Sequence, residues 1–272
     1  MTATAIAPAI SERPQRSALA WAVSDTKTIA WRNLITLKRL PQLLIFATVQ
    51  PVIFVLMFRY VFGGAIKVPG VPYVDYLMPG VFAQTVAFGA IQTGIGLAED
   101  LHKGLIERFR SLPMARSAVL AGRTLADLVR NVFVVALMLA VGYLVGFRIQ
   151  TNVLGLIAGM GVMLLFGFSL TWIFAIIGLS TSNAETAQAA SFPILAPLVF
   201  ASSAFVAVTS MPGWLQAFAK NQPVSVAIDA VRSLVLGGHY ANTGKVVASI
   251  AWSVGIIAVF APLAIRRYRQ AA

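Results

Sequence analysis

The side chains that could do chemistry in this sequence gather in one stretch. Residues 98–131, AEDLHKGLIERFRSLPMARSAVLAGRTLADLVRN, contain four of the nine acidic and six of the 21 basic residues of the chain. Hydrophobic runs long enough to cross a bilayer lie on both sides of this stretch. Mixed charges beside apolar residues are suited to ion pairing and to docking a soluble partner. They also occur in a solvated loop that only carries positive charge on the cytoplasmic side of a membrane.

Catalytic and metal-binding groups are otherwise sparse. The chain has no cysteine, which excludes disulfides, thiolate metal sites and a cysteine nucleophile. Its two histidines, His102 and His239, are isolated, and Asp75, Glu185 and Asp229 are scattered among the expected loops. We therefore predict no catalytic residue and no metal ligand.

The sequence also lacks the phosphate-binding pattern G-x-x-x-x-G-K-[ST]. The segment GGHYANTGKV comes near to it, but Gly238 is one residue too far from the Gly244–Lys245 step and Val246 replaces the hydroxyl residue. We predict that the chain binds no cofactor and is not itself an ATPase.

The elements that must position the charged stretch are membrane helices. The chain is 58% hydrophobic and only 11% charged, with a mean hydropathy of +0.82, whereas soluble domains are about 25% charged. The net charge of +12 comes from basic residues that flank apolar runs, a pattern that records membrane orientation. Nucleic acid is not an expected partner.

Six apolar segments approach or exceed the roughly 20 residues that a spanning helix needs. They are residues 43–62, 77–97, 131–147, 153–179, 187–208 and 246–265. The third is expected to begin before Asn131 as a continuation of the preceding cytoplasmic helix. The fold class is therefore an all-α polytopic membrane protein with six transmembrane helices.

Lysine and arginine placement predicts the orientation, because these residues are retained in the cytoplasm during insertion. With both termini inside, the cytoplasmic segments hold six such residues in 1–42, six in 98–131 and three in 266–272, against six on the opposite side. Residues 1–42 are then a cytoplasmic tail with an interfacial helix over 25–40 that has Trp31 on its apolar side. The spanning domain covers 43–265, and 266–272 form the C-terminal tail.

A helix–turn–helix is expected within the coupling region, residues 98–130. Four apolar residues form one helical stripe: Leu101, Leu105, Phe109 and Leu112. Pro113 ends this helix, and a second helix continues into the third span. In the second helix, Arg123 and Asp127 have i,i+4 spacing, and Asp127 and Arg130 have i,i+3 spacing, so both pairs are candidates for ion pairing.

Two segments carry a resemblance to a known family. KGLIERFRSLPMARSAVLAGRTLADLVRN resembles the cytoplasmic segment of type-2 ATP-binding cassette exporter permeases, especially the daunorubicin-resistance subfamily. NQPVSVAIDAVRSLVLGG, residues 221–238, resembles the element that precedes the last span in that family, with Pro223, Asp229 and Arg232 in register. Gln222 interrupts the usual Asn-Pro step, which leaves Asn221 without the family role.

The resemblance implies a multi-pass permease of the cell (inner) membrane, involved in antibiotic resistance. Two permease chains, identical or related, would pair above two separate ATPase subunits that hold ATP and magnesium, and would expel a hydrophobic drug, a secondary metabolite or a lipid-like molecule. A coupling helix between spans two and three would dock on the ATPase. The residues expected to make that contact are Leu105, Glu107, Arg108, Phe109 and Arg110.

The segment between spans five and six, residues 209–245, is too apolar for an ordinary exposed loop. We expect it in the outer leaflet, and the resemblance implies short re-entrant helices there. Asp229 and Arg232, at i,i+3 spacing, would form an ion pair or would lie at the water surface.

Polar residues within the spans are almost all neutral, which disfavours an ion-coupled secondary transporter. The candidates for an export pathway are Gln50, Gln84, Gln92, Ser169 and Thr171. Contacts between packed helices would account for them equally well. A non-transporting membrane scaffold would share the bulk composition and differs only in lacking an ATPase-docking segment.

The coupling region yields a direct prediction. Replacing Glu107 or Phe109 by alanine removes an orienting charge or an apolar anchor, so we expect weaker coupling between ATP hydrolysis and transport, with the chain still inserted in the membrane. Transport in vesicles that contain both subunits measures the effect. Normal transport by both variants would contradict the assignment.

Overall fold

The computed structural model describes residues 18–39, 41–66, 68, 70–105 and 116–271. Over these residues the chain is helical and contains no strand. The α-helices, in chain order, are α1 (Ala18–Arg39), α2 (Pro41–Leu56), α3 (Tyr73–His102), α5 (Arg116–Val145), α6 (Val153–Ser180), α7 (Ala184–Phe200), α8 (Gly213–Asn221), α9 (Pro223–Val235) and α10 (Thr243–Ala271). A π-helix, η1 (Met57–Phe62), continues α2, and η2 (Val208–Ser210) and η3 (Gly238–Tyr240) are single 3-10 turns.

Four helices in the described part of the chain are long and apolar enough to cross a membrane: α3, α5, α6 and α10. Each has 28 to 30 residues, which corresponds to about 42 to 45 Å and exceeds the roughly 30 Å hydrocarbon core of a bilayer. They match the second, third, fourth and sixth predicted spans. The first predicted span corresponds to α2 with η1, which include a shorter apolar helix over Thr48–Phe62. The fifth corresponds to α7, a helix of 17 residues.

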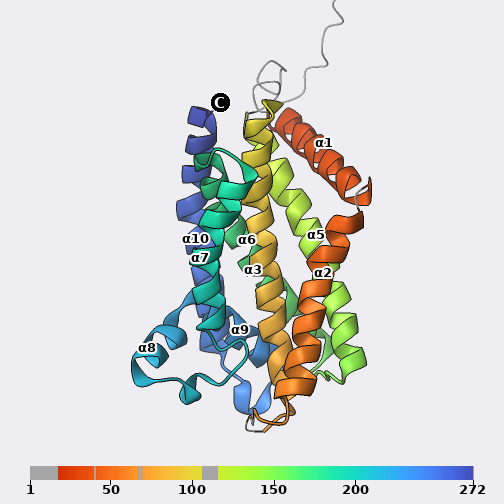
Figure 1. The fold of residues 1–272 in the computed structure, drawn as a ribbon, viewed down its shortest axis with the longest axis vertical. Helices are drawn as coiled ribbons and strands as arrows, with labels where there is room; N and C mark the ends of the chain where they lie inside the picture. Colours follow the sequence, from red (N-terminus) through yellow and green to blue (C-terminus); the bar gives the residue numbers. More distant parts are fainter. Residues whose placement is uncertain (1–17, 40, 67, 69, 106–115, 272) are drawn as a thin grey trace, which may run out of the picture.

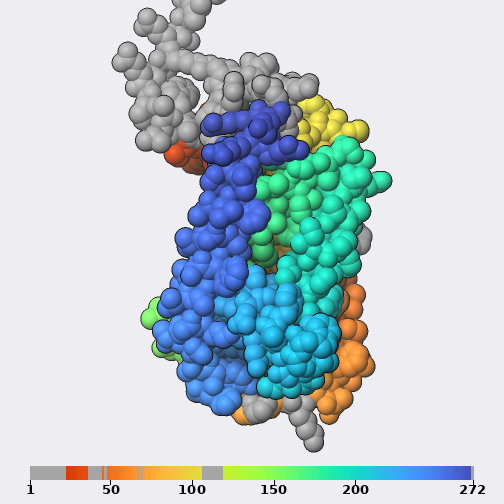
Figure 2. Space-filling model, turned by 90° about the vertical axis from the view of Figure 1, so that its left-hand side faces the viewer, coloured from red at the N-terminus to blue at the C-terminus, as the bar shows by residue number. Residues whose placement is uncertain are grey.

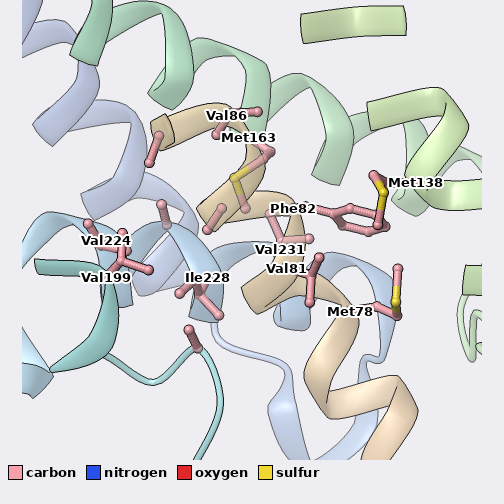
Figure 3. Packing of buried hydrophobic residues seen from close by; sticks show 14 of the residues in the cluster. Met78, Val81, Phe82, Val86, Met138, Met163, Val199, Val224, Ile228 and Val231 are labelled. Carbon is pink, nitrogen blue, oxygen red and sulfur yellow. The ribbon is translucent and has the colours of Figure 1, made fainter. Parts of the chain in front are cut away.

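Helix α3 is the centre of the bundle, and nearly every residue in its first half is buried. It packs against α6, α7, α5, α2 and α9, and Figure 1 shows it between α7 and α2. Figure 3 shows part of the shared core, in which Phe82 and Met78 of α3 lie near Met138 of α5 and Val231 of α9. Because all five helices pack against α3, a displacement of α3 changes its contacts with each of them.

The two ends of the bundle differ in content (Figure 1). One end, here named the α1 end, contains α1, the last turn of α3, the beginning of α5 and the end of α10. The other, the α9 end, contains α8 and α9. Helix α1 and the C-terminal end of α10 therefore lie at the same end of the bundle, as the predicted topology requires.

Helix α1 confirms the helix expected over residues 25–40, but its contacts differ from the prediction. It packs on the first part of α5, where Ile29 lies against Gly122. Ile29 and Ala30 are buried, whereas Trp31, which was expected on the apolar side, is exposed. The side of α1 that faces α5 therefore contains Ile29 and Ala30, whereas the hydrophobic pattern alone suggested the side with Trp31.

The fifth predicted span, residues 187–208, ends as a helix at Phe200, eight residues early. The hydroxyls of Tyr73 and Tyr76 donate hydrogen bonds to the carbonyls of Phe205 (2.8 Å), Ser203 and Val206 (both 3.2 Å). In residues 201–207, after the helix ends, these carbonyls accept side-chain hydrogen bonds from the start of α3.

Glycines allow close approach within this one chain. Gly155 and Gly159, a G-x-x-x-G step, face Leu234, Val231 and Val235 of α9. Where α3 crosses α6, Gly94 and Gly178 are in mutual contact, and a methyl group on Gly178 would overlap the carbonyl group of Gly94. Small residues at such crossings let backbones pack directly.

We expect Gly178→Ala to lower stability by about 1 to 3 kcal/mol, the usual effect of overpacking a well-filled interior. Gly161→Ala, on the same helix, is the matched control because its added methyl group meets no atom within 4 Å. The thermal unfolding midpoint of the purified protein in detergent measures both. Equal midpoints for the two variants would show that the α3–α6 crossing tolerates a side chain.

Candidate functional site

Arg232 is the most elaborately bound side chain at the α9 end. It is only 2% exposed. Its Nη2 donates to the carbonyls of Ser203 (2.6 Å) and Tyr76 (2.9 Å), its Nε donates to the Tyr76 carbonyl (3.2 Å), and its Nη1 pairs with Asp229 (3.2 Å). The guanidinium carbon lies 3.4 Å from the centre of the Tyr76 ring. This residue therefore joins α9, the start of α3 and the segment after α7.

The family motif residues occupy the helix that presents Arg232. Pro223 is the first residue of α9, a position that suits its fixed φ and missing N–H. Gln222 caps this helix by accepting from the backbone N–H of Val224, and its Nε2 donates to the carbonyl of Leu198 (2.7 Å). The residue that interrupts the Asn-Pro step thus performs the capping role, while Asn221 is exposed.

Asp229 has a second basic partner that the sequence analysis did not predict. The Nζ of Lys245, in the first turn of α10, lies 3.6 Å from Oδ2 of Asp229 and donates to the carbonyl of Lys220 at 3.1 Å. Tyr240 lies nearby, with its ring 6.2 Å from that of Tyr76. Burial raises the pKa of Tyr240, and the Arg232 cation partly opposes this shift. The tyrosine stays neutral near pH 7.

Asp75, expected in a loop, is buried in the first turn of α3. Its carboxylate accepts the backbone N–H of Arg148 (2.8 Å) and the side-chain amide of Gln150 (3.3 Å). The loop between α5 and α6 also hydrogen-bonds the end of α9 through Thr151 and the Leu234 carbonyl (2.8 Å). These bonds fasten the α9 end without forming a reactive site.

At the α1 end, one ion pair joins α3 to α5 and a second lies within α5. Arg123 pairs with Asp100 of α3 rather than with Asp127, so the predicted i,i+4 pair is wrong. The predicted i,i+3 pair between Arg130 and Asp127 is present at 3.0 Å. Packing against α3 explains the difference, because it brings Asp100 next to Arg123, whereas Asp127 accepts a 2.6 Å hydrogen bond from Thr93.

The α3–α5 contact continues towards the middle of the bundle. Arg130 donates to the carbonyl of Gly89 at 2.7 Å, and the side chain of Arg123 lies directly over Gly96. Arg123 passes over Gly96, which has no side chain to block it, and Arg130 binds the carbonyl of Gly89. The arrangement fixes α3 and α5 relative to each other beside the segment that links them.

The predicted ATPase-contact residues lie mostly outside the described residues. Leu105 is described and half-buried. Glu107, Arg108, Phe109 and Arg110 fall in the segment 106–115, which the structure does not describe. The Asp100–Arg123 ion pair lies just outside both ends of this segment.

The predicted pathway residues divide into two groups. Ser169 and Thr171 are buried, and each donates to a carbonyl of its own helix, at 2.7 Å and 2.6 Å, so they are occupied in packing. Gln50 and Gln92 are exposed. Gln84 is 2% exposed, and its Oε1 has no hydrogen-bond partner.

Three glutamines share one side of the bundle, formed by α2, α3 and α7 and here named the α2/α3/α7 face. Phe88 of α3 lies 6.2 Å from Phe192 of α7, ring centre to ring centre. Gln84 and Gln92 are each one turn away from Phe88, on the same side of α3. Gln50 lines a shallow hollow of about 290 Å³ on α2.

Gln188 of α7 belongs to this face and was not predicted. It lies one turn from Phe192, towards the α1 end, and is exposed. Gln92 is displaced from Phe88 in the same direction, so Gln92 and Gln188 lie at one level on neighbouring helices. Sequence analysis did not single out Gln188, because it lies near the start of a predicted span and close to Glu185.

No group of three or more histidine, aspartate or glutamate residues that could hold a metal ion occurs within the described ranges.

The chain is similar to characterised families of membrane transporters. Residues 24–236 match the model of the ABC-2 type transporter family. The "Daunorubicin resistance ABC transporter permease protein DrrB1" of Streptomyces coeruleorubidus is 42% identical over 260 residues, which cover 95% of this chain and 90% of that protein.

Two further relatives come from Mycobacterium tuberculosis. The "Probable doxorubicin resistance ABC transporter permease protein DrrC" is 30% identical over 233 residues, 83% of this chain and 81% of that protein. The "Doxorubicin resistance ABC transporter permease protein DrrB" is 28% identical over 184 residues, 66% of this chain and 61% of that protein.

The Arg232 cluster can be tested by Arg232→Lys. Lysine keeps the charge but loses the planar fork that reaches several carbonyls at once. We expect a loss of stability of about 1 to 3 kcal/mol, the usual effect of a buried polar group left without its partner, and reduced transport. Arg267→Lys, at an exposed arginine near the end of α10, is the control and should change neither. A wild-type unfolding midpoint for Arg232→Lys would contradict a role of Arg232 in joining α9 to α3.

Proposed function

We infer that this chain, which belongs to the ABC-2 type transporter family, is the membrane permease subunit of an ATP-driven drug exporter. The observation that carries this conclusion is the match to a daunorubicin-resistance permease along 95% of the chain. The helical bundle, with its four long apolar helices, is the architecture that such a subunit needs.

ATP is bound by a separate subunit in this proposal, because the chain has no phosphate-binding loop of its own. Two ATPase subunits, carrying ATP and magnesium, dock at the α1 end on the segment that links α3 to α5. Leu105, Glu107, Arg108, Phe109 and Arg110 make that contact. The Arg123–Asp100 ion pair and the hydrogen bonds from Thr93 to Asp127 and from Arg130 to Gly89 support the proposal, since they let α3 and α5 respond together to a pull on the segment between them.

The chain crosses the cell membrane six times, with α2–η1 and α7 as the two shorter crossings. Both termini and the coupling region are cytoplasmic, so the α1 end faces the cytoplasm and the α9 end faces outward. Support comes from the lysine and arginine distribution and from the location of α1 and the end of α10 at the same end of the bundle.

The permease works as a pair of chains, either two copies or one copy with a related chain. We place the export pathway on the α2/α3/α7 face, because its polar residues are neutral and include Gln84, whose buried carbonyl oxygen lacks a partner. Gln50, Gln92 and Gln188 extend this polar surface along the bundle. Amide groups among phenylalanines suit a flat, lipophilic molecule that carries hydroxyl or carbonyl groups.

Affinity purification of the tagged chain from its native membrane tests the function. We expect a nucleotide-binding subunit to co-purify, and the reconstituted complex to move an anthracycline at the expense of ATP. Gln92→Leu should lower this transport by roughly fivefold, the effect of about 1 kcal/mol from one lost hydrogen bond, with the ATPase still bound.

Ser169→Ala is the matched control, because the Ser169 hydroxyl is buried and bonded within its own helix. We expect transport by this variant to equal that of the wild type. Purification without any ATPase, under conditions that preserve complexes, would overturn the exporter conclusion. Normal transport by Gln92→Leu would overturn only the placement of the pathway.

A further inference from the structure

Helix α8 stands apart from the bundle. Figure 1 shows it projecting sideways at the α9 end, and Figure 2 shows it on the lower part of the adjacent face. It packs mainly against α9 and η2, and Ala219 is its buried residue. The remaining faces of this nine-residue helix have no covering element in the described chain.

The uncovered side of α8 is aromatic. Trp214 is 77% exposed and Phe218 is 45% exposed. Together with Ala217 and Asn221, which are also exposed, they occupy positions i, i+3, i+4 and i+7, which is one face of a helix. If this face were exposed to water, two large apolar side chains would remain unburied on a helix that has few other contacts.

The depth of α8 follows from its connection to α10. The Lys245 ammonium, in the first turn of α10, donates to the carbonyl of Lys220 at the end of α8 (3.1 Å). Residues 246–265 of α10 carry no charge, and Arg266 is the next basic residue. From Lys245 to Arg266 the helix rises about 32 Å, close to the roughly 30 Å thickness of the hydrocarbon core. Lys245 therefore lies at one boundary of that core, and the end of α8 lies beside it.

We propose that α8 is a membrane anchor that lies along the surface of the bilayer, with Trp214 and Phe218 inserted among the lipid headgroups and upper acyl chains. Tryptophan is favoured at this depth because its ring is apolar and its N–H can bond to headgroups. Lys220, which is exposed on the same boundary, suits contact with lipid phosphates. The leaflet is the outer one under the orientation proposed above.

A second copy of the chain is the competing occupant of this face. A helix of nine residues is about 14 Å long and about 10 Å wide, which is small beside the roughly 800 Å² per partner of a stable interface. Lipid needs no such area, because each aromatic ring inserts independently. The size and chemistry of the face therefore favour lipid.

The absence of cysteine makes a spin-label test direct. Ala217→Cys places a single nitroxide between the two aromatic residues, and Ala251→Cys, at an exposed alanine of α10 about 9 Å further along the span, is the matched control. Both full-length variants are reconstituted in vesicles of phosphatidylcholine and phosphatidylglycerol. Collision with oxygen, which dissolves in hydrocarbon, is compared with collision with a water-soluble nickel chelate.

We expect the label at 217 to collide more with oxygen than with the nickel chelate, at a shallower depth than the label at 251. Adding Trp214→Ser and Phe218→Ser should shift the 217 label towards the nickel chelate. Preferential collision with nickel in the parent variant, an immobile label that meets neither reagent, or an unchanged depth after the two serine substitutions would each overturn the proposal. The readout is the depth of the label rather than transport, so the result for α8 does not depend on the exporter function.

Discussion

A guanidinium group buried in an apolar bundle is stable only when its donors are matched by nearby acceptors. At the α9 end, Arg232 meets this requirement mainly with backbone carbonyls, those of Tyr76 and Ser203, and with Asp229. The carbonyl of Tyr76 belongs to the first turn of α3, whereas that of Ser203 lies after the end of α7. The Arg232 guanidinium therefore joins α9 to α3 and to the non-helical segment 201–207.

The α1 end solves the same problem with side chains. Arg123 and Arg130 each pair with an acid, one on α3 and one on α5 itself. Helix α3 is thus held near both of its ends, by Asp100 at one and by the Tyr76 carbonyl at the other. Between them lie 23 residues, and the rise from Tyr76 to Asp100 is about 36 Å. The half of this stretch nearer Tyr76 packs mainly against apolar side chains, and the other half also contacts Arg123, Asp127 and Arg130 of α5.

Sequence patterns predicted what depends on composition and on spacing within a helix. Apolar runs gave the long helices, and i,i+3 spacing gave both Asp127–Arg130 and Asp229–Arg232. The partners of Arg123 and the second partner of Asp229 were missed, because they come from other helices. In the sequence, Gln222 reads only as an interruption of a motif, because its bond to the carbonyl of Leu198, 24 residues earlier, depends on the fold. Spacing along one helix carries no information about such contacts.

The division between charged ends and a neutral middle fits a machine that is driven mechanically. A transporter driven by an ion gradient must bind that ion inside the membrane, and therefore needs charged or coordinating side chains there. A permease moved by a separate ATPase has no such need. Under the proposed function, its charges fix α3 to α5 at the end where the ATPase would dock and α3 to α9 at the opposite end, and the amides of the α2/α3/α7 face remain available to bind cargo. Helix α3 connects the two ends.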